Sequence, residues 1–276
     1  PLAGWRPLVP EKEGKLPIDD SDGGCDVAAP KGQHRAWSRQ HPAIEIHDGD
    51  AITDGFEAFY LMKQKGIENV IVMGVHTNMC VLGRPFSIRQ MATQGQNVVL
   101  MRDMTDSMYN PDREPKVSHF RGTDLVVEHI ERHWCPTITS SVFTGKAPFR
   151  FSDDRRPHIA IIVNDNEYHS DQTLRAFAQR ELIEKRDWFV SFIDGEPKGG
   201  FRGMEVLPTA DVAIIAARRT PVTPREKELI DAFVASGRPL IGLRTASHAF
   251  SLRGPAPEGL VNLETFDADV WGGSYS

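Results

Sequence analysis

Short apolar runs rich in β-branched residues alternate along this chain with longer segments in which apolar residues recur every three or four positions. The short runs are typical of strands in a parallel sheet, and the longer segments are typical of amphipathic helices. In the first half, the pattern predicts strands at 44–47, 70–75, 97–101 and 137–140, and helices at 56–65, 81–94 and 124–133. In the second half, it predicts strands at 158–163, 188–193, 211–216 and 239–243, and helices at 172–184 and 225–235. Strands that alternate with helices form βαβ units, so we expect an α/β fold of two doubly wound, three-layer units with mainly parallel sheets.

Residues at element boundaries refine the prediction for the first half. Asp54 is a candidate N-cap for the first helix, and Gly66 follows that helix where a left-handed conformation is favoured. The strand at 70–75 is expected to be fully buried, because its apolar run is unbroken. Pro85 must lie in the first turn of the next helix, since proline lacks the backbone N–H that a helix interior requires. The first 42 or so residues are rich in Pro, Gly and Asp and carry no predicted element.

A segment rich in Gly, Pro and charged residues, 142–156, separates the two halves and is expected to be a linker. It divides the chain into domains at 1–141 and 157–276. In the second domain, Thr223 is a candidate N-cap for the last predicted helix, and Gly237 is expected to end it.

Composition limits the class of protein. The chain has 276 residues, 40% of them hydrophobic and 25% charged, with a net charge of −6, which is typical of a globular protein and favours neither nucleic acid nor membrane as a partner. No apolar run approaches the ~20 residues needed to cross a bilayer. Cys25, Cys80 and Cys135 lie far apart, without disulfide or zinc spacing, which favours a cytoplasmic location and no metal or cofactor.

Cys80 lies at a strand-to-helix junction, between the apolar run at 70–75 and the helical pattern at 81–94. The first turn of a helix leaves backbone N–H groups unpaired and carries partial positive charge, which favours a thiolate and can hold a developing oxyanion. Cys80 is therefore a candidate nucleophile. The alternative is that it is a small buried hydrophobe, as free cysteines usually are, and this is the role expected of Cys135.

The residues around this cysteine resemble the isochorismatase-like cysteine hydrolases, a family that includes nicotinamidases. The resemblance is carried by Gly74-Val75-His76-Thr77-Asn78-Met79-Cys80-Val81. It implies a three-layer α/β fold, a Cys, Lys and Asp triad, and a non-proline cis peptide at Val75-His76. It also implies that the backbone N–H groups of His76 and Cys80 form the oxyanion hole.

Two members of the implied triad are not found at their expected places. The family's catalytic Asp lies on a first strand, which we expect upstream of Pro1, so that the first domain lacks its N-terminal strand and exposes apolar surface. Whether a targeting signal also lies upstream of Pro1 is not decided by this sequence. The position of the family's Lys falls near 44–47, where His47 is the best occupant. His47 is therefore a candidate catalytic residue, with a hydrogen-bonded histidine at a strand end as the alternative.

Other polar residues near the junction are candidate substrate contacts: Thr77, Asn78, Arg84 and Asp103, together with the side chain of His76. Each has a simpler alternative. Arg84 and Arg89 could pair with acidic neighbours, and Asp103 and Asp106 could serve only as turn residues.

A polar cluster in the first segment has metal-binding residue types, but its spacing fits no standard motif and favours solvated loop residues. Its members are Asp22, Cys25, Asp26, His34 and His41.

The second half resembles the trehalose-utilisation (ThuA-like) domains, which share the class I glutamine amidotransferase fold. The carrying residues are Asn166-Glu167-Tyr168-His169 and Leu243-Arg244-Thr245-Ala246-Ser247-His248-Ala249-Phe250. The resemblance implies a fold and a carbohydrate-type ligand, with His169 and His248 as candidate substrate-binding residues. Glutaminase chemistry is not implied, because no cysteine follows Cys135. The end of the chain after Trp271-Gly272-Gly273 suggests that this domain, too, is incomplete.

These observations predict a cysteine-nucleophile hydrolase that cleaves a C–N bond of a small molecule, amide or ureido, through a thioester on Cys80. The alternative is a non-catalytic protein with a decayed triad that binds small, carbohydrate-type molecules. A third prediction is an enzyme whose second domain acts on sugars. Association into homo-oligomers is also open.

Overall fold

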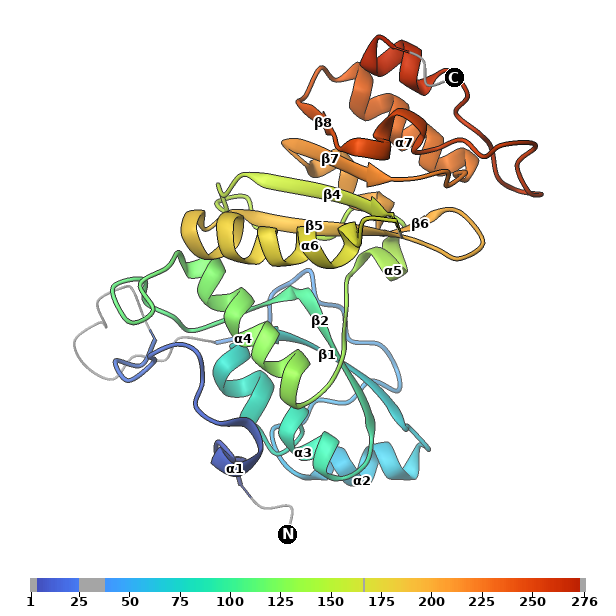
Figure 1. Cartoon of the computed structure of the whole chain (residues 1–276). Helices are drawn as coiled ribbons and strands as arrows, with labels where there is room; N and C mark the ends of the chain where they lie inside the picture. The colour runs from blue at the N-terminus through green and yellow to red at the C-terminus, as the bar shows by residue number, and fades with distance from the viewer. Residues whose placement is uncertain (1–3, 25–37, 166, 274–276) are drawn as a thin grey trace. The chain divides into compact units, whose positions relative to one another are not determined.

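The computed structural model describes residues 4–24, 38–165 and 167–273 (Figure 1). The chain divides into two compact units, Pro1–Thr139 and Ser140–Ser276. Both contain strands joined by helices, and all strand pairs but one are parallel, so the predicted α/β class with mainly parallel sheets is confirmed.

The sheet of unit 1 has the strand order β1-β2-β3, with all strands parallel. The strands are β1 (Asn69–Val75), β2 (Asn97–Asp106) and β3 (Thr137–Ile138). The spatial order of these strands is the same as their order along the chain, so each new strand is added on the same side of the sheet. The described strands of unit 1 therefore do not form the doubly wound arrangement predicted for this half. No strand forms at 44–47, so that prediction was wrong.

Helices precede and connect these strands. They are α1 (Pro10–Glu13), α2 (Glu57–Gln64), the π-helical turn η1 (Thr77–Val81), α3 (Ile88–Thr93) and α4 (His119–His133). Gly66 has the predicted left-handed conformation after α2, whereas Asp54 is not its N-cap, because the helix begins after Phe56. α4 begins five residues earlier than predicted, where the Ser118 hydroxyl accepts the Arg121 N–H. None of the helices among the described residues is both long and apolar enough to span a bilayer.

The predicted helix at 81–94 is broken. A first helical stretch ends near Gly83, and α3 begins again after Ser87. The break falls at Pro85, which has no N–H to donate and whose ring clashes with the carbonyl one turn earlier. The segment that follows Cys80 is therefore much shorter than the pattern predicted.

One face of the unit 1 sheet packs against helices. Its core joins apolar residues of the strands to those of α3 and α4: Val70, Val72, Val98, Leu100, Leu82, Ile88, Met91, Val126 and Ile130. The other face of β1 is exposed, with Ile71, Met73 and Val75 at 40%, 53% and 58% of their full accessibility. The prediction that this strand is fully buried was wrong, because β1 lies at the sheet edge and is covered on one face only.

Unit 2 has a five-stranded sheet in the order β6-β5-β4-β7-β8. Its strands are β4 (His158–Asn164), β5 (Phe189–Gly195), β6 (Phe201–Arg202), β7 (Val212–Ala217) and β8 (Leu240–Gly242). Only β6 is antiparallel. The chain runs from β4 to one side and then returns to the other side, so this sheet is doubly wound as predicted.

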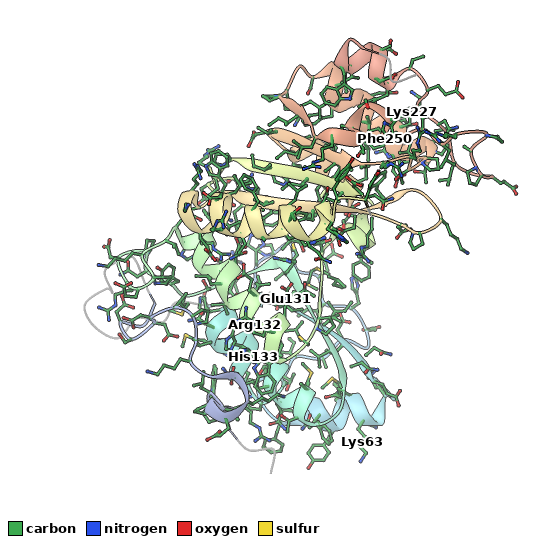
Figure 2. All side chains as sticks on the ribbon, viewed as in Figure 1. Lys63, Glu131, Arg132, His133, Lys227 and Phe250 are labelled. Carbon is green, nitrogen blue, oxygen red and sulfur yellow. The ribbon has the colours of Figure 1, made fainter. Side chains whose placement is uncertain are left out.

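Helices cover both faces of that sheet. They are α6 (Ser170–Phe177) and η2 (Ala178–Glu184) on one face, and α7 (Pro224–Ala235) with η3 (Met204–Thr209) on the other. Alternate residues of β4 face the two helical layers, Ile161 towards α6 and η2 and Ile162 towards α7. Phe250 lies in the interior on the α7 side, edge to face with Phe201 and Phe266, whereas Lys227 projects from the exposed face of α7 (Figure 2).

The ends of α7 follow the prediction. The Thr223 hydroxyl accepts the Glu226 N–H, and the Glu226 carboxylate accepts the Thr223 N–H at 2.7 Å, which completes a capping box. Gly237 adopts the left-handed conformation after the helix. The turn after β8 forms η4 (Arg244–His248), and η5 (Asp267–Trp271) lies near the end of the described chain.

The predicted linker at 142–156 belongs to unit 2. It begins with α5 (Ser141–Thr144), and its end is held by Asp154, whose carboxylate accepts from Arg150 Nε at 3.1 Å and Arg156 Nε at 2.9 Å. Both guanidinium groups lie over the ring of Phe189 in β5. Charged residues that looked like those of a solvated linker therefore form a partly buried clamp.

Candidate functional site

Cys80 lies in η1, directly after the carboxyl end of β1. The peptide between Val75 and His76 is cis, as the resemblance implied. Cys80 is half-buried and free, whereas Cys135 is buried and free. Burial raises the pKa of Cys135 to about 11, so that thiol is inert at neutral pH. Of these two cysteines, only Cys80 combines access to solvent with a place at the end of a parallel strand.

Thr77 fixes the start of the turn. Its hydroxyl bonds to that of Thr105 on β2 at 2.7 Å, and the Thr105 hydroxyl donates to the Gly74 carbonyl at 2.7 Å. Thr77 is completely buried. Thr77 therefore supports the turn that carries Cys80, and its contact with substrate stays a prediction.

Asn78 ties the same turn to two other segments. Its amide nitrogen donates to Asp20 Oδ2 at 2.9 Å and to the Met108 carbonyl at 3.0 Å, and its amide oxygen accepts the Met108 N–H at 2.9 Å. The side chain is 5% exposed and its hydrogen-bonding capacity is largely used. Asn78 thus also supports the turn, and its contact with substrate stays a prediction.

Asp106 and His119 form a second polar arrangement at the same sheet edge. Asp106 ends β2 opposite Val75 in the strand register, and its Oδ1 lies 2.9 Å from His119 Nε2. The other ring nitrogen of His119 lies 2.9 Å from the Tyr109 carbonyl. Both ring nitrogens thus lie within hydrogen-bonding distance of an acceptor oxygen. Sequence reasoning missed His119; the available signal was a histidine at a helix start shortly after an acidic strand end.

The remaining candidates in unit 1 include His76, Arg84 and Asp103. His76 is half-buried, and its carbonyl accepts the N–H groups of Met79 and Val81. The oxyanion-hole role of its own N–H stays a prediction. Arg84 lies over the Trp5 ring. Asp103 lies within β2 and not after it, because that strand continues to Asp106.

His47 lies in an exposed turn, where its backbone N–H donates to Asp50 Oδ2 at 2.7 Å and its ring lies 3.7 Å from Glu45. The strand that was to place it at the position of the family's Lys does not form, so the structural basis of its catalytic assignment is lost.

The possible metal cluster falls largely outside the described residues, since Cys25, Asp26 and His34 lie there. Asp22 accepts the Gly24 N–H at 2.9 Å and the Asn110 amide at 3.0 Å. Within the described ranges, no three His, Cys, Asp or Glu side chains are grouped closely enough to hold a metal ion.

In unit 2, the loops that follow β4 and β8 contact each other. The Arg244 guanidinium lies 4.4 Å from the centre of the Tyr168 ring. His169 is exposed and caps α6 in a left-handed conformation, and the His248 ring contacts the Ser247 hydroxyl at 3.1 Å. Asn166 lies outside the described residues. The substrate-binding roles of His169 and His248 stay predictions.

No family model, curated protein or solved structure matches the chain. The fold thus defines the class as an α/β protein with mainly parallel, Rossmann-like sheets.

Proposed function

We propose that unit 1 acts as a cysteine-nucleophile hydrolase of the isochorismatase-like kind, cleaving an amide or ureido C–N bond of a small molecule. The observation that supports this most is the place of Cys80, half-buried at the carboxyl end of a parallel strand in a turn held by Thr77 and Asn78. Ligand sites in such sheets lie at this edge.

In the proposed reaction, the Cys80 thiolate attacks the carbonyl carbon, and a C–S bond forms while the π electrons move to oxygen. The backbone N–H groups of His76 and Cys80 stabilise that oxyanion. Collapse of the intermediate breaks the C–N bond, the leaving amine takes a proton, and water then hydrolyses the thioester.

The reaction also needs an acid or base that takes the thiol proton and gives one to the leaving amine. No side chain in the described ranges bonds to the Cys80 sulfur. The broken helix also confines any dipole effect to a short segment.

The test is the pH dependence of alkylation by iodoacetamide, measured for each cysteine by peptide mass spectrometry. We expect Cys80 to react well below the pH at which ordinary thiols, with a pKa of about 8.5, become reactive. Cys135 should stay unmodified in the folded protein. A Cys80 rate that follows the ordinary thiol profile, together with no hydrolysis of an amide and ureido panel, would contradict the proposal.

A second candidate is a non-catalytic protein that binds small molecules. It is favoured by the lack of a described acid or base on the Cys80 thiol. Saturable binding of an amide without turnover, retained in Cys80→Ser, would support this candidate over hydrolysis.

A further inference from the structure

A cavity of about 400 Å³ opens at the carboxyl edge of the unit 2 sheet. Segments that are far apart in sequence build its wall. Asn164 ends β4, Lys198 lies in the turn between β5 and β6, and Arg218, Arg219 and Thr220 follow β7. The strand order reverses at β4, and in doubly wound sheets ligands bind outside the carboxyl ends of the strands at such a reversal.

The wall of the cavity carries excess positive charge. Lys198, Arg218 and Arg219 face two acidic residues, Glu167 and Glu196. Glu167 is already engaged, since its carboxylate lies 3.0 Å from Arg218 Nε. A ligand that adds negative charge would therefore balance the wall.

Arg219 is the least satisfied of these groups. Its Nε is buried and has no hydrogen-bond partner among the described residues. A buried donor without a partner is destabilising, and a ligand oxygen that reached it would relieve that penalty. Its backbone is also left-handed, with φ of 50°, a conformation that a non-glycine residue rarely adopts and that is found disproportionately at binding sites.

The surrounding backbone holds Arg219 in place. The Asn164 amide donates to the Thr220 hydroxyl at 2.7 Å, and the Arg218 N–H donates to the Asn164 carbonyl at 2.9 Å. The Arg219 N–H donates to the His248 carbonyl at 2.9 Å. Burial lowers the pKa of His248, and the charges of Arg219 and its neighbours lower it further against the opposing effect of Glu167, which is consistent with a positive potential here.

We propose that this cavity binds a small organic anion, a molecule of sugar size whose phosphate or carboxylate oxygens accept from Arg219 and Lys198. The site is independent of Cys80 and of the hydrolase proposed for unit 1. Arginine is suited to this role because its planar fork of donors matches phosphate and carboxylate.

Calorimetric titration of the full chain at fixed ionic strength tests the proposal with four probes: inorganic phosphate, glucose 6-phosphate, gluconate and glucose. We expect saturable binding of glucose 6-phosphate or gluconate, and the stronger of the two identifies the anionic group. Inorganic phosphate should bind more weakly than glucose 6-phosphate if phosphate is that group. Glucose should not bind.

Variants locate the site. Arg219→Gln and Lys198→Ala should each weaken binding at least fivefold, whereas Arg225→Gln, on the exposed face of α7, and Cys80→Ser should leave it unchanged. Lys198 lies on an exposed turn, so its variant decides the matter if Arg219→Gln fails to fold. Glucose binding as tightly as the two anions, no saturable anion binding, or unchanged affinity in Lys198→Ala would overturn the proposal.

Discussion

Glu13 and Arg89 form a buried, two-pronged ion pair in unit 1. Arg89 Nε donates to Glu13 Oε1 at 2.8 Å, and Arg89 Nη2 donates to Oε2 at 2.9 Å. The same carboxylate accepts from His129 Nε2 at 2.9 Å and Trp134 Nε1 at 2.8 Å. One carboxylate thus joins the single turn of α1 to α3 and to the end of α4. Arg89 therefore pairs with an acidic residue, which is the simpler of the roles open to it.

Glu13→Gln should destabilise unit 1 by about 3–5 kcal/mol, because it leaves the Arg89 charge buried without a counter-charge. The measurement is the midpoint of the unit 1 transition in urea. Glu11→Gln, on the exposed side of the same turn, is the matched control and should shift that midpoint little. Equal midpoints for the two variants would show that the ion pair does not hold this segment.

The same pair should make unit 1 sensitive to acid. Burial alone would raise the pKa of Glu13, but hydrogen bonds from Arg89 and His129 outweigh it and hold the pKa at about 2. The unfolded chain, with a Glu pKa of about 4.5, binds the proton first, so stability present above that pH is lost as pH falls towards 2. The free energy of unfolding of unit 1 should fall by about 3 kcal/mol in all. Urea titrations from pH 5 downwards should show this loss of unfolding free energy. In Glu13→Gln, the free energy of unfolding should depend less on pH over the same range.

His158 should give unit 2 its own acid sensitivity at a higher pH. Burial lowers the pKa of His158 from 6.5 to about 4, and its ring lies 2.9 Å from the Ser191 hydroxyl. Because the unfolded chain takes up the proton first, stability is lost as pH falls from about 6.5 to about 4, by about 3 kcal/mol in all. Thermal unfolding at pH 7 and pH 5 measures this, with exposed His169→Gln as the control. A pH dependence unchanged by His158→Gln would exclude this histidine as the cause.

Asn78→Ala should loosen the turn that carries Cys80. It removes both hydrogen bonds to Met108 and the one to Asp20, and an unsatisfied buried group costs about 1–3 kcal/mol. Alkylation of Cys80 should then follow the profile of an ordinary exposed thiol. Asn69→Ala, at the exposed start of β1, should leave both stability and alkylation nearly unchanged. A wild-type alkylation profile in Asn78→Ala would mean that this side chain does not position the cysteine.

Much of unit 2 could be predicted because its signals are local. The unbroken apolar run of β4 marks a strand covered on both faces, and Thr223 and Gly237 mark the ends of α7 through hydrogen bonds and dihedral preferences within a few residues. The same rules failed for β1, whose apolar run is equally continuous although one of its faces is exposed. An unbroken apolar run shows that both faces of a strand can be buried. Whether both faces are buried depends on the helices and strands that pack against it.

The sequence by itself determined the α/β class, most of the strands and the place of Cys80 at the end of one of them, because side-chain periodicity and turn residues act over short distances along the chain. Only the tertiary structure decided which polar residues meet. Glu13 and Arg89, Asp106 and His119, and Asn164 and Thr220 are brought together by segments 13 to 76 residues apart. Such pairings depend on how strands and helices pack, and no local pattern of hydrophobic and polar residues encodes them.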